Sequence, residues 1–284
     1  MLNKLLHRSI AAVDSRLVLL TPPEALIPAS FENVEVGPVR HADLLADMQR
    51  LRGRIYLRDG AVEPHHLTGD GRHQTPEDEK SWHLLMLDTR GRVDACVWYM
   101  NHDPGISANR LRVRHCPLAH EPMWRETLWG AVELELMRAR QASIGFAEVG
   151  GWAVAESSRC TSQGLVLALA GYSLGRVMGG TLGMTTATVR HCSSAILRRL
   201  GGSDLSIDGR TVPSYYDPRY KCEMELLRFD SRHPSPKYTG LVDLLKEKLS
   251  DVLVITPQKE ESTGFSLLSG RGEASFQQVI LAPI

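Results

Sequence analysis

Apolar positions recur along the chain at two spacings, which predict helices and strands. From His41 to Tyr56 they fall at three- and four-residue steps, as on one face of a helix, and Trp124 to Gln141 carries a similar stripe. The runs from Trp82 to Leu87 and from Val93 to Met100 are almost continuously apolar and are separated by Asp88-Thr89-Arg90-Gly91. This arrangement predicts a β-hairpin that is covered on both faces.

The second half of the chain predicts a buried helix followed by shorter elements. Leu165 to Met178 holds Arg176 as its one charged residue, so this helix should be buried on most sides, and Gly179-Gly180 should end it. The other expected elements are strands at Leu111 to Cys116, Met184 to Val189, Leu205 to Ile207 and Lys221 to Phe229, a helix from Cys192 to Leu200, and a helix beginning at Thr239.

The order of these elements predicts an α/β (α+β) fold in which a mixed sheet is covered by helices on both faces. Residues 1–40 include Pro22, Pro23 and Pro28 and are interpreted as an N-terminal extension. Residues 41–256 are expected to form the main domain. After Ile255 the sequence becomes polar and rich in Gly and Ser, which predicts a disordered or lightly docked C-terminal tail over residues 257–284.

Composition limits the classes of function. With 284 residues, 43% of them hydrophobic, the chain can bury a sizeable core. The formal net charge of zero gives no global attraction to nucleic acid or to an acidic membrane. Five cysteines without a C-x-x-C motif are typical of reduced thiols. No stretch approaches the roughly 18 apolar residues that span a bilayer, so the sequence predicts no transmembrane segment and a cytoplasmic location.

One segment, Phe146 to Gly164, combines several features of a ligand site. A Gly150-Gly151 pair interrupts strand-like residues, which indicates a β-bulge or a place where a ligand lies against bare backbone. A polar turn then leads into the apolar helix, and N–H groups at a helix start favour an anion such as phosphate. The alternative is an ordinary strand-to-helix unit whose glycines only ease packing.

The loop between Gly60 and Ser81 contains His65, His66 and His73 near acidic residues. The spacing matches no zinc signature, so we expect no metal site there. A mobile lid over a ligand site is the interpretation that we favour.

The element order and the central segment resemble the GNAT superfamily of acyl-CoA N-acyltransferases. The phosphate-binding pattern of that family, Q/R-x-x-G-x-G/A, is matched by Arg159-Cys160-Thr161-Ser162-Gln163-Gly164, except that Ser162 replaces the middle glycine. The resemblance implies a mixed, mostly antiparallel central sheet in which two central strands splay apart and admit the pantetheine arm of an acyl donor.

A closer resemblance, over about residues 44 to 230, is to acyl-homoserine lactone synthases and long-chain N-acyl amino acid synthases. Their central strand motif E-L-S-R-F-A-V is similar to Glu148-Val149-Gly150-Gly151-Trp152-Ala153-Val154, and their early R-x-x-V-F element is similar to Arg52-Gly53-Arg54-Ile55-Tyr56. Asp78 echoes an acidic loop residue. Two arginines of the lactone synthases are replaced, by Gly151 and by Val97-Trp98-Tyr99. These departures favour an acceptor other than the precursor of a homoserine lactone, such as another amino acid.

The resemblance implies transfer of an acyl group from a thioester to a primary amine. Glu148 would act as the base; alternatively, it would be a structural carboxylate paired with an arginine of the early helix. Backbone N–H groups of Gly151 and Trp152 would polarise the carbonyl, and the glycines would open room beside it. The phosphate would be held by Arg159, Thr161, Ser162, Gln163 and Gly164, and the acceptor side would be shaped by Arg52, Tyr56 and Asp78.

The implied donor is acyl-CoA or acyl-phosphopantetheine on acyl carrier protein (acyl-ACP), with no tightly bound cofactor. A carrier protein would be met by basic residues, for which the candidates are Arg176, Arg190, Arg198 and Arg199. We do not expect Cys160 or His191 to be catalytic, because direct transfer needs no covalent intermediate. The alternatives are an acetyl-CoA-dependent acetyltransferase of a protein or small-molecule amine, and a non-catalytic binding module with the same fold.

Overall fold

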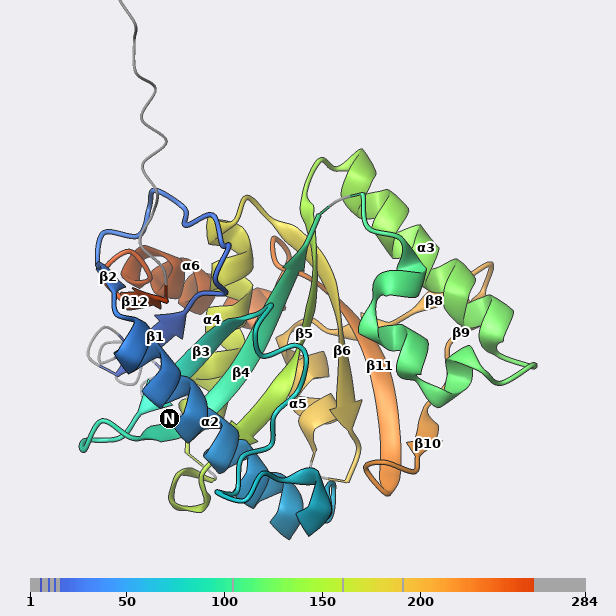
Figure 1. The fold of residues 1–284 in the computed structure, drawn as a ribbon. Coiled ribbons are helices and arrows are strands. Elements are labelled where there is room, and N and C mark those ends of the chain that lie inside the picture. Colours follow the sequence, from blue (N-terminus) through green and yellow to red (C-terminus); the bar gives the residue numbers. More distant parts are fainter. Residues whose placement is uncertain are drawn as a thin grey trace, which may run out of the picture.

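The computed structural model describes residues 6, 10, 13, 16–103, 105–159, 161–190 and 192–257. Within these ranges ten strands form one sheet in the order β10-β11-β6-β5-β4-β3-β1-β12-β2, with β7 also paired to β11 (Figure 1). The strands of this sheet are β1 (Leu17–Leu20), β2 (Val34–Val36), β3 (Trp82–Leu87), β4 (Val93–His102), β5 (Gly145–Val154), β6 (Thr181–Thr188), β7 (Ser203–Asp204), β10 (Tyr215–Asp217), β11 (Cys222–Asp230) and β12 (Leu253–Thr256). A separate small hairpin joins β8 (Ser206–Ile207) to β9 (Arg210–Thr211).

Most neighbouring strands are antiparallel, and the centre of the sheet is an exception. β5 and β6 run parallel because α4 (Gln163–Val177) connects them, as a parallel pair requires a crossover. The predicted hairpin of β3 and β4 is present, and both strands are buried along almost their whole length. The mixed, mostly antiparallel sheet that the sequence predicts is therefore confirmed.

Helices cover both faces of this sheet, and alternate strand residues serve the two sides. On one face, α2 (Pro38–Arg58) packs over Leu85 and Cys96, while α3 (Arg125–Gln141) packs over Phe146 and Leu182. On the other face, α4 and α6 (Thr239–Lys248) cover Leu84 and its neighbours on β1 and β4 (Figure 1). α5 (Ser193–Leu200) lies against β6 and β11. No helix in the described ranges has the length and apolar character needed to cross a bilayer.

The predicted strand at Leu111 to Cys116 is wrong. This segment forms short 3-10 turns at Ala108–Arg110, Arg112–His115 and Pro117–Ala119. Its apolar residues Leu111, Val113 and Cys116 are nevertheless buried, because the turns direct them into the core beneath α3. Burial without regular periodicity explains why the apolar pattern was misleading here.

The ends of the sequence contribute more to the sheet than the sequence suggests. β1 lies between β3 and β12, and β2 forms the edge beside β12, so residues 17–20 and 34–36 of the predicted extension are strands of the central sheet. These strands are short, which hid their periodicity. Residues 258–284, most of the predicted tail, lie outside the described residues.

Candidate active site

The two parallel central strands separate part-way along the sheet. Their pairing begins at Gly145 with Thr181 and ends at Val149 with Thr185. Beyond this point β5 continues beside β4 as far as Val154, while β6 continues beside β11 as far as Thr188. Backbone groups of β5 after Val149 therefore have no strand partner on the β6 side.

A β-bulge lies at the point of separation. Trp98 pairs with Gly150 and Cys96 pairs with Ala153, so the two residues Gly151 and Trp152 lie opposite the single residue Val97. Gly151 has a φ of +66°, a value that favours glycine. The extra residue changes the side-chain alternation, so that Val149, Trp152 and Val154 all pack against the α4 side. The bulge predicted from the glycine pair is confirmed.

The space beside the two glycines is occupied by protein. A Cβ atom on Gly150 would lie 2.4 Å from Trp98 Cζ2, and one on Gly151 would lie 2.2 Å from Trp98 Cδ1. The expectation that the glycines open room beside the donor carbonyl therefore needs correction, because the Trp98 indole fills the position that their side chains would take.

A cavity of about 730 Å³ extends from this separation. Tyr56 of α2 lies on its wall from one side of the sheet, and Leu167 and Tyr172 of α4 line it from the other. Both faces of the sheet thus contribute to its wall where the strands separate. Its inner part is mainly apolar, with further lining from Val97, Trp152, Val154, Leu165, Ala168, Ile196, Leu197, Phe229 and Tyr238.

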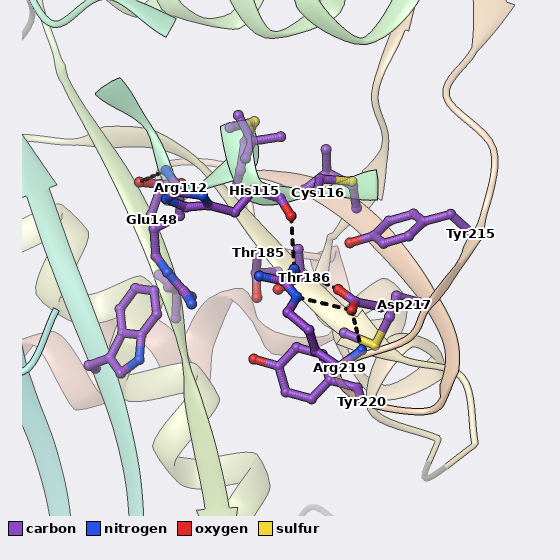
Figure 2. A pocket seen from close by; sticks show the side chains of 16 residues that line it. Arg112, His115, Cys116, Glu148, Thr185, Thr186, Tyr215, Asp217, Arg219 and Tyr220 are labelled. Carbon is purple, nitrogen blue, oxygen red and sulfur yellow. Dashed lines mark hydrogen bonds and ion pairs between the residues drawn. The ribbon is translucent and has the colours of Figure 1, made fainter. Parts of the chain in front are cut away.

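A second, polar cavity of about 40 Å³ adjoins the first. The two share Arg112, Val149, Thr185, Thr186, Tyr220 and Met224 as lining residues. Glu148 and Arg112 lie at one side of the small cavity, and the pair of Asp217 and Arg219 lies at the other (Figure 2). The buried carboxylate of Glu148 thus lines the small cavity, next in sequence to Val149, which lines both cavities.

Glu148 is buried and held through one of its two carboxylate oxygens. Oε2 lies 3.0 Å from His102 Nε2 and also accepts a hydrogen bond of 3.0 Å from the backbone N–H of Arg112. Oε1 accepts no hydrogen bond from any described residue. The alternative of an ion pair with an arginine of α2 is not what the structure has, since among the described residues the side-chain partner of Glu148 is His102 and Arg52 is bound to Asp78.

Arg52 and Asp78, two of the three residues expected on the acceptor side, form a buried ion pair. Arg52 donates to both carboxylate oxygens of Asp78 at 2.8 and 2.6 Å, and Asp78 also accepts from Gln49 and the Thr75 N–H. Burial opposes the negative charge, but the hydrogen bonds from Arg52 leave the pKa of Asp78 lowered. Neither Arg52 nor Asp78 lines either cavity, whereas Tyr56 lines the large one.

The predicted phosphate turn precedes and begins α4. Arg159, Thr161 and Gly164 line the large cavity, whereas Ser162 and Gln163 do not. The Arg159 guanidinium is 2.9 Å from Asp59, and the Thr161 hydroxyl donates to Ser158 O at 2.7 Å. A Cβ atom on Gly164 would lie 3.3 Å from the Trp152 indole, so a small residue suits this position.

The four arginines suggested for a carrier protein lie in different environments. Arg190 and Arg199 line the large cavity. Arg176 is tied to Asp243 and to backbone carbonyls of Ser231 and Arg232, and Arg198 is tied to Glu225 and Asp204. Any patch at the cavity would therefore combine Arg190 and Arg199 with Arg159 rather than with Arg176.

The remaining candidates from the sequence have less to do with the cavities. Cys160 and His191 lie outside the described residues. The rings of His65 and His66 pack at a tilted angle with their centroids 4.0 Å apart, while His73 packs edge-on against Tyr56 at 5.5 Å. Over the described ranges, no group of three or more His, Cys, Asp or Glu side chains is placed to hold a metal ion.

Three residues of the site were not singled out in the sequence: Trp98, His102 and Arg112. Trp98 entered the sequence analysis only within the run Val97-Trp98-Tyr99, and nothing in the pattern indicates that its ring fills the space of two distant glycines. Arg112 lies in the segment expected to be a strand, which would have placed its side chain differently. His102 follows the predicted end of the second hairpin strand, and the extra length of β4 brings it to Glu148.

Comparisons with known proteins reveal similarity at the level of the fold. No protein-family profile and no curated protein matches the sequence. Among solved structures, the CoA-dependent acyl-homoserine lactone synthase BjaI, determined with SAM and isopentyl-CoA, shares 14% identity, covering 85% of this chain and 92% of BjaI, at a TM-score of 0.50.

Two further solved structures are similar over much of their length. MesI, a CoA-dependent acyl-homoserine lactone synthase, shares 15% identity over 82% of this chain and 93% of its own, at a TM-score of 0.45. FeeM, an N-acyl amino acid synthase from uncultured soil microbes, shares 12% identity over 70% of this chain and 89% of its own, at a TM-score of 0.42. At these identities it is the match to BjaI that supports a common fold. The chain has a GNAT-like fold of the kind seen in an acyl-homoserine lactone synthase, as the sequence predicts.

Proposed function

We propose that the protein is an N-acyltransferase that moves an acyl group from an acyl-CoA or acyl-ACP thioester to the primary amine of an amino acid. The observation that carries this proposal is the meeting of two cavities at the separated strands. A large apolar cavity there adjoins a small polar one that contains the buried carboxylate of Glu148.

The large cavity suits the acyl donor in both of its parts. Arg159, Thr161 and Gly164 line the cavity near the N-terminus of α4, where the positive end of the helix favours a phosphate. Gly171 and Tyr172 line the same cavity seven and eight residues further along α4, which is about 10 to 12 Å at the rise of an α-helix. A donor whose phosphate lies at the turn would place its pantetheine arm along this span, and the rest of the cavity, which measures about 730 Å³ in all, would take an acyl chain longer than acetyl.

The BjaI structure, which contains isopentyl-CoA, has the same fold. This similarity makes an acyl-CoA donor compatible with the architecture. The arginines at the cavity, Arg159, Arg190 and Arg199, would serve either the phosphates of CoA or the acidic surface of a carrier protein.

The chemistry follows from the placement of Glu148. An incoming ammonium gives one proton to Oε1 of Glu148, and the resulting amine attacks the thioester carbonyl. The oxyanion is stabilised by backbone N–H groups at Gly151 and Trp152, in the part of β5 that has left β6. Collapse breaks the C–S bond, the thiolate takes the second proton from nitrogen, and the products are an amide and a thiol.

The two acceptor-side residues Arg52 and Asp78 would act indirectly. Their ion pair fixes the loop of residues 60–81 to α2, and this loop reaches the cavity through Ala61. Tyr56 would then shape the wall directly. Ser162 and Gln163 would likewise support the phosphate turn, since Ser162 precedes the first residue of α4.

Product identification tests this function. The purified protein is incubated with acyl-CoA and acyl-ACP donors of several chain lengths and a mixture of amino acids and simple amines, and products are found by mass spectrometry. An N-acyl amino acid with a chain longer than acetyl is expected. Products limited to acetylated amines would establish the acetyltransferase alternative, and no thiol release with any donor would contradict the proposal in favour of a binding module.

A further inference from the structure

Arg112 occupies the junction of the two cavities. It lines both of them, together with Val149 and Tyr220. Its backbone N–H is the group that binds Glu148 Oε2 at 3.0 Å, so its main chain and the proposed base are held in a fixed relation. A ligand group next to the free oxygen of Glu148 would therefore lie near the Arg112 side chain as well (Figure 2).

Contacts with the protein hold the Arg112 guanidinium in place but occupy only part of its hydrogen-bonding capacity. Its Cζ lies 5.2 Å from the centre of the Trp98 ring, a distance typical of a cation–π contact. Nε is 2.8 Å from Glu77 Oε1. Neither terminal nitrogen donates a hydrogen bond to any residue in the described part of the chain. Two donors of the guanidinium fork thus remain for a ligand.

The other arginine of the small cavity is committed to the protein. Arg219 donates to both oxygens of Asp217 at 3.1 and 2.7 Å, and to the backbone carbonyl of His115 at 2.9 Å. Asp217 is buried, so this pair would leave a buried unpaired charge if Arg219 moved to a ligand. Arg112 is the better candidate for a ligand anion.

The Arg112 side chain also approaches the β-bulge of β5. Position 151 is glycine here, and the Trp98 ring lies against it. Because the Arg112 guanidinium stacks on that same ring, a cation is brought from the 3-10 turn of residues 112–115 to the neighbourhood of the bulge. The small cavity therefore pairs one carboxylate, for an ammonium, with one guanidinium fork, for a carboxylate.

We propose that Arg112 binds the carboxylate of the acceptor and thereby selects amino acids over amines that lack this group. This inference rests on the proposed N-acyltransferase function and adds a specificity-determining residue to it. The amine of the same acceptor would face Oε1 of Glu148, since both residues line the small cavity.

The test compares matched acceptors and matched variants. The acceptor pairs are leucine with 3-methylbutylamine, and phenylalanine with 2-phenylethylamine, each with the acyl donor that gives most product. The enzymes are the parent protein, Arg112→Gln, Arg112→Lys and the control Arg114→Gln. Arg114 is two residues away and lines neither cavity, and its side chain contacts His115 and the Asn109 carbonyl.

The parent protein is expected to prefer the amino acid in kcat/KM. Loss of charge-assisted hydrogen bonds should lower kcat/KM of Arg112→Gln for the amino acid by about 10- to 100-fold, mainly by raising KM. Turnover of the simple amine should stay within about twofold, because the backbone N–H that binds Glu148 is retained. The kcat/KM of Arg112→Lys for the amino acid should lie between those of the parent and Arg112→Gln. Arg114→Gln should behave as the parent.

Two results would overturn the inference, and they are distinguishable. Acylation of both members of a pair with equal kcat/KM by the parent, or an equal fall for both in Arg112→Gln at an unchanged melting temperature, would remove the role of Arg112 and leave the N-acyltransferase function standing. No acylation of any amine by the parent would remove that function and this inference together. If Arg112→Gln has a lowered melting temperature, Arg112→Lys decides instead. A lower preference of Arg112→Lys for the amino acid over the simple amine, with an unchanged melting temperature, would still support the proposal.

Discussion

Single residues at the centre of the sheet set the shape of the site. The Trp98 ring and the two glycines depend on one another, since a side chain on either glycine would overlap the ring. Gly151 has the further requirement of a positive φ. The glycine pair is thus explained by packing against an aromatic side chain that lies on the neighbouring strand.

Replacing Gly151 with alanine should destabilise the protein by about 1 to 3 kcal/mol, because the new Cβ overlaps the Trp98 ring and the left-handed backbone is strained. Urea unfolding followed by circular dichroism measures this change. At Gly150, where the overlap is the main cost, the double variant Gly150→Ala with Trp98→Leu should lose less stability than the sum of the two single variants. Equal stability of Gly151→Ala and the parent would show that the bulge is not constrained as described.

At this scale the sequence was informative where a backbone feature leaves a local mark. The pair Gly150-Gly151 predicts the bulge, and the place of Glu148 just before that pair makes it the candidate for the base. The partners of Glu148 could not be found in this way, because His102 and Arg112 are 46 and 36 residues away from it and meet it only after the strands pair.

Among the elements, α2 and the loop of residues 60–81 act as one unit. Arg52 and Asp78 join them by a buried ion pair, and His83 Nε2 lies 2.8 Å from the Asp78 carbonyl oxygen. An acceptor-side role for these two residues is a prediction from the resemblance to lactone synthases. Their burial away from both cavities indicates that their direct effect is on the stability of the loop.

Arg52→Met should cost about 3 to 5 kcal/mol, since it leaves Asp78 buried without its cation. Adding Asp78→Asn should cost less than the sum of the two single changes. The measurement is urea unfolding at neutral pH of the two single variants and the double variant. A large increase in KM for the acceptor, with stability unchanged, would instead support direct binding of the acceptor by Arg52.

The helices and the long strands were predictable because α2 and α3 have a clear helical period, while β3, β4 and α4 are almost continuously apolar runs. α2, α3 and α4 lie where the apolar spacing placed them, to within a few residues. The segment from Leu111 to Cys116 and the strands β2 and β12 were not predictable in this way. They are too short for a period to be distinguished from irregular burial, and β2 and β12 exist only because other strands pair with them.

For the molecule as a whole, buried histidines make stability depend on pH. Burial lowers the pKa of His83 to about 4, and partial burial together with the nearby Arg52 charge lowers the pKa of the half-buried His73 to about 4 as well. An unfolded histidine has a pKa of about 6.5. The unfolded chain therefore binds protons between about pH 6.5 and 4 that the folded protein does not, so the free energy of unfolding falls as pH decreases through this window.

Replacing His83 with glutamine, which retains a donor for the Asp78 carbonyl, should reduce this pH dependence. The parent should lose on the order of 3 kcal/mol at His83 between pH 6.5 and pH 4, and His83→Gln should not show that contribution. Urea unfolding at intervals of pH checks this, with the exposed His65→Gln as the control. A parallel decline of His83→Gln and the parent would rule out His83 as a source.

The whole molecule also explains why the site lies where it does. β5 separates from β6 after Val149. This separation leaves space for a cavity whose walls come from both α2 and α4. No local pattern gives the dimensions of this cavity, because α2, α4, α5 and four strands contribute to its wall. The sequence could therefore predict the type of fold and the proposed base, but not the second cavity or its arginine.

The most direct test of the account is the rate of thiol release by Glu148→Gln. The parent protein, Glu148→Gln and the control Glu133→Gln, an exposed glutamate on α3, are compared with one acyl donor and one amino acid, after their melting temperatures have been shown to agree. Loss of the general base should reduce the rate by roughly 10²- to 10⁴-fold in Glu148→Gln and leave Glu133→Gln unchanged. An unchanged rate in Glu148→Gln would contradict the proposed mechanism.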